Sequence, residues 1–218
     1  MLVVSTRREL VNAALFTPFM ASSNYTNPSL LLVDIITNYV PRDFLQAVSK
    51  TGRFLYRGES SIKTFKVLAP QPDLLIPGTY DDSTALDYFQ CLENRLKERE
   101  INAIPSKGHI ATSDVKDASQ WGEAVSIWPL GASFSFVWPK EGKFLFPPST
   151  PCPDDELVIN HDLETALRLG HEVLFASSLD VPKRLPGHVG DLPNSSFLAV
   201  SPSMEDELRA HMQLPGLT

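Results

Sequence analysis

The pattern of apolar and polar positions divides the chain into an early helical part and a later part made of short segments. The first fifty residues are predicted to be helical in up to three pieces, residues 5–16, 29–39 and 42–50. Residues 29–39 are nearly all apolar, which is typical of a helix buried on most of its surface. Pro41 and Gly52 stand where helices favour proline and glycine, just before and just after the third piece.

From Phe54 onward the apolar runs shorten, and the pattern predicts strands interrupted by helices. The predicted strands are residues 54–57, 61–68, 108–113, 124–128, 133–138, 143–146, 171–177 and 196–201. The predicted helices are residues 81–100, 115–122, 162–169 and 204–212. Residues 133–136 alternate between polar and apolar side chains, and residues 133–138 are interpreted as a half-buried strand. Because helices gather early and do not alternate regularly with strands, the fold class is predicted to be α+β.

The longest predicted helix, residues 81–100, has a clear apolar stripe. The stripe consists of Leu86, Phe89, Leu92 and Leu96. The second half of the helix, residues 93–100, is rich in charged side chains and is interpreted as a solvent-exposed face.

The composition is that of an ordinary water-soluble globular protein, with 43% hydrophobic and 21% charged residues. A length of 218 residues is long for one domain and short for two. We expect a single domain over residues 1–218, with 1–53 as a helical lead-in and 54–218 as the core. The formal net charge of −7 argues against nonspecific binding to nucleic acid, which needs Lys and Arg facing phosphates.

The sequence contains no apolar run of about 18 residues, so neither a membrane-spanning helix nor a membrane partner is predicted. Arg7 and Arg8 precede a short apolar run, which loosely suggests a targeting signal within residues 1–22. Glu9 and Pro18 interrupt that pattern, so an ordinary N-terminal helix is favoured.

Several well-known catalytic signatures are missing from the sequence. It has no Gly-x-Ser-x-Gly nucleophile elbow, no Gly-x-x-x-x-Gly-Lys-Ser/Thr phosphate loop and no Gly-x-Gly-x-x-Gly fingerprint. Cys91 and Cys152 do not form a Cys-x-x-Cys pair, and the five histidines show no metal-ligand spacing, so no metal is expected. Cys91 lies within a predicted helix and is expected to be a buried free thiol.

Three predicted strands each carry a polar group that is suited to chemistry. Arg57 stands in Leu-Tyr-Arg-Gly, Thr112 and Ser113 stand in Ala-Thr-Ser-Asp, and Glu172 stands in Gly-His-Glu-Val-Leu-Phe. The intervals are 56 residues from position 57 to position 113, and 59 residues from there to position 172. An arginine, a hydroxyl pair and a glutamate in this order indicate a ligand that carries both a diphosphate and a labile glycosidic bond, which points to NAD.

The order, spacing and strand context of these segments resemble the ADP-ribosyltransferase fold of the arginine-serine-glutamate class, the branch that includes toxins. The resemblance covers roughly residues 54–201. It implies a split two-sheet, mostly antiparallel core, and mono-ADP-ribosyl transfer with NAD as the substrate and a protein as the acceptor. It further implies a soluble protein, either cytoplasmic or secreted into a host cytosol as an effector or toxin.

The resemblance also implies roles for individual residues. Glu172 is the catalytic carboxylate that stabilises positive charge on the ribose, and Arg57 is the anchor for NAD. The hydroxyls of Thr112 and Ser113 hold the strand pair together and orient Glu172, so both count as catalytic-site residues. Thr112 is also a cofactor-binding candidate, together with Tyr56, Gly58, Trp128 and Phe134. The aromatic rings of Tyr56, Trp128 or Phe134 would flank the nicotinamide.

Two positions depart from the pattern of the family. Gly170 stands two residues before Glu172, where the family usually has the Glu or Gln that assists the acceptor. Ala111 begins the hydroxyl triplet, unless the frame shifts by one residue so that Thr112 is the equivalent hydroxyl and Asp114 is the last position.

These departures keep two alternatives open, a noncatalytic interaction module or degenerate transferase, and an NAD glycohydrolase that uses water as its acceptor. The enzymatic interpretation requires Arg57 and Glu172 to project from the same face of the sheet. Each motif also has a simpler interpretation. Arg57 pairs with Glu59, the Thr-Ser-Asp segment caps the next helix, and Glu172 is a charge on an edge strand.

Overall fold

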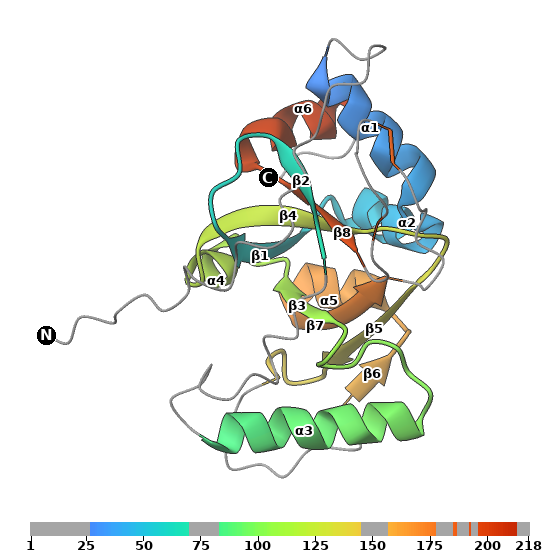
Figure 1. Cartoon of the computed structure of the whole chain (residues 1–218), viewed down its shortest axis with the longest axis vertical. Helices are drawn as coiled ribbons and strands as arrows, with labels where there is room; N and C mark the ends of the chain where they lie inside the picture. Colours follow the sequence, from blue (N-terminus) through green and yellow to red (C-terminus); the bar gives the residue numbers. More distant parts are fainter. Residues whose placement is uncertain are drawn as a thin grey trace, which may run out of the picture.

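The computed structural model describes residues 27–69, 83–144, 157–177, 185–186, 192 and 196–212. These residues form an α+β fold, which confirms the predicted fold class (Figure 1). The helices are α1 (Pro28–Tyr39), α2 (Arg42–Thr51), α3 (Ser83–Glu98), α4 (Val115–Ser119), α5 (Leu163–Leu169) and α6 (Pro202–Met212). The strands are β1 (Leu55–Glu59), β2 (Phe65–Leu68), β3 (His109–Thr112), β4 (Glu123–Pro129), β5 (Phe134–Pro139), β6 (Leu157–Ile159), β7 (Glu172–Ser177) and β8 (Phe197–Val200).

The strands form one sheet, in the order β2-β8-β4-β1-β3-β7-β5-β6, and every neighbouring pair is antiparallel. The expected division into two separate sheets is therefore corrected. The connection between β1 and β3 is nevertheless narrow, because these strands share the single residue pair Tyr56↔Thr112. By contrast, β1 and β4 share five residue pairs. We call the narrow connection the β1–β3 seam. Strands in a twisted sheet diverge from one another, and a short contact of this kind keeps the sheet continuous while its halves turn apart.

The two described N-terminal helices confirm the predictions for residues 29–39 and 42–50. The Asn27 side chain accepts a hydrogen bond from the Ser29 amide at 2.9 Å and so caps α1. Gly52 ends α2 with a left-handed backbone, φ 66°, which glycine adopts at little cost. Residues 5–16, predicted as a first helix, lie outside the described residues.

The core consists of two apolar clusters, and both include residues of strands β5 and β7. The larger cluster joins α1, α2, β1, β4 and β8, and Trp128, Phe44 and Phe54 are among its fully buried side chains. In the smaller cluster Phe89, Leu92 and Leu96 of α3 pack on β5 and β7. In Figure 1, α3 lies at the bottom of the molecule, whereas α1 and α6 lie at the top.

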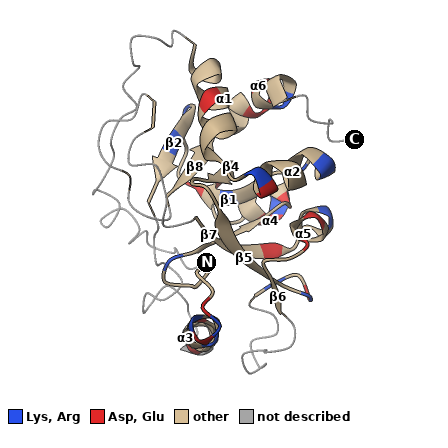
Figure 2. Ribbon diagram, turned by 90° about the vertical axis from the view of Figure 1, so that its right-hand side faces the viewer, with Lys and Arg blue, Asp and Glu red and all other residues tan. Residues whose placement is uncertain are grey.

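One face of α3 departs from the prediction. Charged residues of both signs cover the helix in Figure 2, but Glu93 is only 4% exposed. Its carboxylate accepts hydrogen bonds from the backbone amide and the hydroxyl of Ser106, at 2.7 and 2.5 Å, and pairs with Lys97 at 2.7 Å. Burial opposes ionisation of Glu93, but these donors outweigh it and lower the pKa of the carboxyl. Glu93 therefore holds the chain that leads into β3 and is not a solvated charge.

Three further expectations from the sequence are corrected. The segment 143–146 is not a strand where it is described, because Lys143 and Phe144 lie in a turn. β5 is buried on both faces from Phe136 to Pro139, so its sequence alternation does not reflect one solvated face. The free Cys91 thiol is half-buried and not fully buried. The strand β6 was not predicted.

Candidate functional site

The three chemistry-bearing segments lie on neighbouring strands of the sheet. β1 carries Arg57, β3 leads to Ser113, and β7 begins with Glu172. In the ladder, Tyr56 pairs with Thr112 and Thr112 pairs with Glu172. β7 lies between β3 and β5, so the interpretation of Glu172 as an edge-strand charge is wrong.

Glu172 is held where helix α5 turns into β7. Gly170 ends α5 with φ 74°, and its left-handed backbone redirects the chain into the strand. The backbone amide of Glu172 donates to the Gly142 carbonyl at 2.7 Å, and one oxygen of its carboxylate accepts from the Phe144 amide at 2.8 Å. Burial raises the pKa of the Glu172 carboxyl, and the Phe144 amide and the Lys143 charge offset part of that increase. The carboxylate is therefore poorly solvated and is held by a backbone donor.

The two hydroxyls of the Thr-Ser pair contact the end of α5. The Thr112 hydroxyl donates to the Gly170 carbonyl at 2.9 Å and accepts from the Asp114 amide at 3.0 Å. The Ser113 hydroxyl donates to the Leu167 carbonyl. These bonds fix the backbone that precedes Glu172, so both residues position the carboxylate through the chain and not by direct contact. Thr112 lies directly opposite Glu172 in the ladder between β3 and β7.

The simpler interpretation of the Thr-Ser-Asp segment is also confirmed. The Asp114 carboxylate accepts from the backbone amides of Lys116 and Asp117, at 2.8 and 3.4 Å, and so caps α4. The same three residues, Thr112 to Asp114, thus cap α4 and contact the end of α5 before Glu172.

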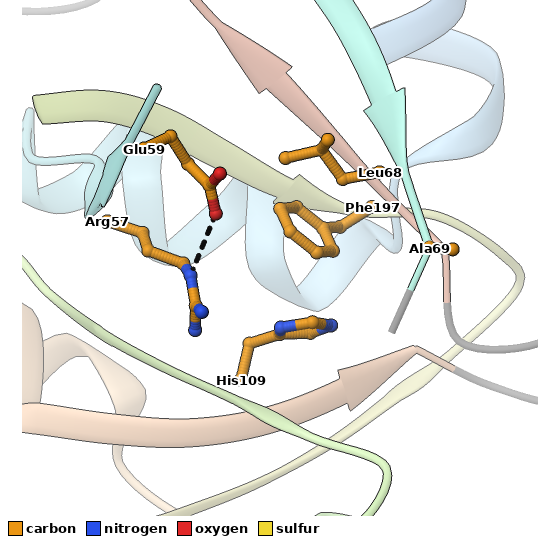
Figure 3. Close-up of a pocket in the computed structure, with 6 residues that line it drawn as sticks. All are labelled: Arg57, Glu59, Leu68, Ala69, His109 and Phe197. Atoms are coloured by element: carbon orange, nitrogen blue, oxygen red, sulfur yellow. Dashed lines mark hydrogen bonds and ion pairs between the residues drawn. The ribbon is translucent and has the colours of Figure 1, made fainter. Parts of the chain in front are cut away.

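Arg57 projects from the other face of the sheet. Directly paired residues share a face and consecutive residues alternate, so Tyr56, Thr112 and Glu172 lie on one face and Arg57 on the opposite one. The Arg57 guanidinium pairs with Glu59 at 2.9 Å, as the simpler interpretation predicted. Figure 3 shows this pair among the residues that line a small pocket. The pocket is lined by Arg57, Glu59, Leu68, Ala69, His109 and Phe197. The predicted convergence of Arg57 with Glu172 is therefore not what the structure has.

His109 is a polar residue of this pocket that the sequence reasoning did not select. Its side chain is 1% exposed, and neither ring nitrogen has a hydrogen-bond partner in the described part of the chain. The ring packs against Phe197, with the ring centroids 4.2 Å apart. Burial, reinforced by the nearby Arg57 charge, lowers the pKa of His109 well below its usual value. The available sequence signal was a lone histidine at the start of a short strand, before Ile110 and Ala111.

The predicted aromatic and glycine contacts to NAD lie elsewhere. Trp128 is fully buried against Phe44 and Phe54, and Phe134 packs edge-on against Phe44. The Tyr56 hydroxyl contacts Glu205 of α6, and burial together with that carboxylate raises its pKa.

Gly58 lies under α4. A Cβ at position 58 would approach the Ala118 carbonyl oxygen and the Trp121 backbone to 2.6 Å. None of the four predicted cofactor contacts Tyr56, Gly58, Trp128 and Phe134 is therefore placed beside the Glu172 carboxylate.

Two other residues that were not predicted lie near Glu172. The Lys143 ammonium pairs with Asp117 of α4 at 3.1 Å, and its charge also acts on Glu172. Asp117 occupies a predicted helix but gave no functional signal, and Lys143 lies in a segment predicted as a strand.

No group of three or more His, Cys, Asp or Glu side chains within the described residues could hold a metal ion. Within the same residues, no helix is long and apolar enough to cross a membrane. Comparison of the chain with protein-family models, with curated proteins and with solved structures finds no match. Function is therefore argued from this chain's own residues.

Proposed function

We propose that this chain is an NAD-dependent mono-ADP-ribosyltransferase-like protein in which Glu172 acts on the nicotinamide–ribose bond without Arg57. The enzymatic interpretation that required Arg57 and Glu172 on one face of the sheet fails, so the proposal rests on Glu172 and its strand partners and assigns no residue to the diphosphate. The observation that carries the proposal is the in-register pair Thr112↔Glu172 on the neighbouring strands β3 and β7, with β1 next to them. The strands that carry Arg57, Thr112 and Glu172 (β1, β3 and β7) are therefore neighbours in the sheet, in the same order as along the chain.

The chemistry assigned to Glu172 follows from its surroundings. Cleavage of an N-glycosidic bond passes through an oxocarbenium-like state, in which the ribose carries positive charge. An ionised carboxylate stabilises that charge more strongly where water is scarce, and Glu172 is half-buried. The Phe144 amide fixes one carboxylate oxygen at 2.8 Å, so the group does not need to reorient as the charge develops.

The acceptor of the ADP-ribosyl group is either a protein side chain or water. Gly170 is the helix cap of α5 with φ 74°, so no side chain at that position assists an acceptor. Without a side chain at position 170 to activate a protein acceptor, two activities fit Glu172. One is hydrolysis of NAD by water, and the other is transfer to a protein acceptor that needs no group at position 170.

A second candidate function, a noncatalytic interaction module, is favoured by one specific observation. Arg57, the expected anchor for the NAD diphosphate, lies on the opposite face of the sheet from Glu172 and is paired with Glu59. A degenerate transferase of this kind keeps the fold and the buried carboxylate without turning over NAD.

The experiment that separates the two candidates is nicotinamide release from NAD, with and without a cell extract as a source of acceptors. On the first proposal the wild type releases nicotinamide, and Glu172→Gln lowers the rate by about a hundred- to a thousandfold. Glu141→Gln, an exposed glutamate in the adjacent turn, is the matched control and leaves the rate unchanged. Absence of release from the folded wild type under both conditions favours the interaction module.

Variation of Arg57 tests the reassignment of that residue. Because Arg57 projects from the other face, Arg57→Gln is expected to leave the rate of release within about threefold of wild type once a folded fraction is confirmed. A loss as large as that of Glu172→Gln would show that Arg57 reaches the same ligand.

A further inference from the structure

The turn formed by residues 142–144 lies over Glu172 and contacts it twice. The Gly142 carbonyl accepts the Glu172 backbone amide, and the Phe144 amide donates to the Glu172 carboxylate. Gly142 has φ 90°, and a Cβ there would come within 3.2 Å of the His171 ring. The hydrogen-bond donor to the Glu172 carboxylate thus comes from a tight turn, so the position of this turn determines whether the bond forms.

One ion pair joins this turn to a different element. Lys143, between the two residues that contact Glu172, reaches Asp117 of α4 at 3.1 Å. Asp117 follows the Asp114 cap of α4, and its own backbone amide is bonded to that cap. The pair therefore spans from α4, next to β3, to the turn that precedes β6.

We propose that Lys143 and Asp117 form a clasp that positions Glu172 by holding the Gly142–Phe144 turn over its carboxylate. The clasp makes both residues positioning residues and not catalytic ones. An effect of the clasp on catalysis rests on the proposed function, whereas its effect on the pKa and the hydrogen bond of Glu172 does not.

The charges around the carboxylate give the clasp a distinctive signature. Lys143 favours ionisation of Glu172 directly, whereas Asp117 opposes it. If charges act only through space, removing the Asp117 charge lowers the pKa of Glu172. If Asp117 holds Lys143 and the Phe144 amide in place, removing it loses both ionising influences, and the pKa of Glu172 rises.

The test is titration of the Glu172 carboxyl by carbon-detected NMR in the wild type, Asp117→Asn and Lys143→Met. The clasp predicts that the pKa of Glu172 rises in both variants, and that the hydrogen-exchange protection of the Phe144 amide falls in both. Lys116→Met, an exposed lysine on the same helix, is the control and moves neither quantity. The charge-swapped double variant Asp117→Lys with Lys143→Asp is expected to restore the Phe144 protection.

A fall in the pKa of Glu172 in Asp117→Asn, with Phe144 still protected, would overturn the clasp. In that case the buried Phe144 side chain, which is 2% exposed, holds the turn by itself. Both readouts are independent of NAD, so the clasp and the proposed activity fail separately. Where the wild type does release nicotinamide, Asp117→Asn is expected to lower kcat by up to about a hundredfold while KM changes little, because misplacing a reacting group slows chemistry more than binding.

Discussion

Replacing His109 tests the account of the pocket beside Arg57 through the pH dependence of stability. His109 is fully buried without a described partner for either nitrogen, and its pKa in the folded state lies well below the ordinary value. The unfolded chain takes up a proton near pH 6.5, whereas the folded chain does not. Above that pH, His109 therefore does not change the free energy of unfolding. Below it, the free energy of unfolding falls by at most about 1.4 kcal/mol per pH unit.

This linkage gives a magnitude that unfolding experiments resolve. Between about pH 7.5 and about pH 5, exclusion of the proton from His109 costs the folded state about 2 kcal/mol. Urea unfolding followed by the fluorescence of buried tryptophan gives the free energy of unfolding at each pH. His109→Gln removes the titrating group. Over this pH range the free energy of unfolding of wild type is therefore expected to drop by about 2 kcal/mol more than that of the variant.

His211→Gln is the control for this comparison, because the His211 side chain is exposed. Its stability is expected to follow wild type across the range. If His109→Gln and wild type instead change in parallel, to within about 0.5 kcal/mol, His109 is solvated or partnered in the folded protein, and the description of the pocket is incorrect.

Three further predictions follow from individual contacts. Burial raises the pKa of the Glu172 carboxyl in the folded state, so at neutral pH the ionised carboxylate destabilises the fold relative to the unfolded chain. Glu172→Gln is therefore expected to raise the melting temperature at neutral pH. The difference from wild type is expected to disappear in acid, where the carboxyl is protonated in both states. Glu93→Ala is expected to destabilise the fold by about 1–3 kcal/mol in urea unfolding, because it leaves the Ser106 amide without its acceptor, whereas Glu98→Ala on the exposed face of α3 changes little. Gly58→Ala is expected to cost about 1–3 kcal/mol, because the added Cβ meets backbone atoms of α4 and the following turn at 2.6 Å; unchanged stability would mean that α4 shifts freely.

Most elements of the fold were predictable from local sequence, because periodicity and end signals act over a few residues. Gly52 and Gly170 mark the ends of α2 and α5, and Asp114 caps α4, as their positions indicated. The charged second half of α3 misled the prediction at Glu93, since its acceptor role depends on Ser106, thirteen residues farther along the chain. Local charge density does not reveal such a partner.

The candidate site was predictable in its strands but not in its geometry. The sequence correctly predicted strands at Arg57, Thr112 and Glu172, whereas the order β1-β3-β7 that makes these strands neighbours is a finding of the structure. A strand's face, however, changes with every residue, so a register with Tyr56 and not Arg57 opposite Thr112 sends the arginine to the other side. The length and spacing of the segments did not reveal that register.

The same limit applies to the aromatic candidates and to Lys143. Trp128 has a side chain suited either to a ligand or to a core, and only tertiary packing against Phe44 and Phe54 decides between them. Lys143 gains its significance from Asp117, which lies on another element.

The most direct test of the central claim is the rate at which the purified protein releases free nicotinamide from NAD, compared between wild type and Glu172→Gln. The account predicts release by wild type and a reduction of about a hundred- to a thousandfold in the variant, with both proteins equally folded. Equal rates in the two proteins would contradict the assignment of Glu172, and no release by wild type with or without cell extract would contradict NAD cleavage itself.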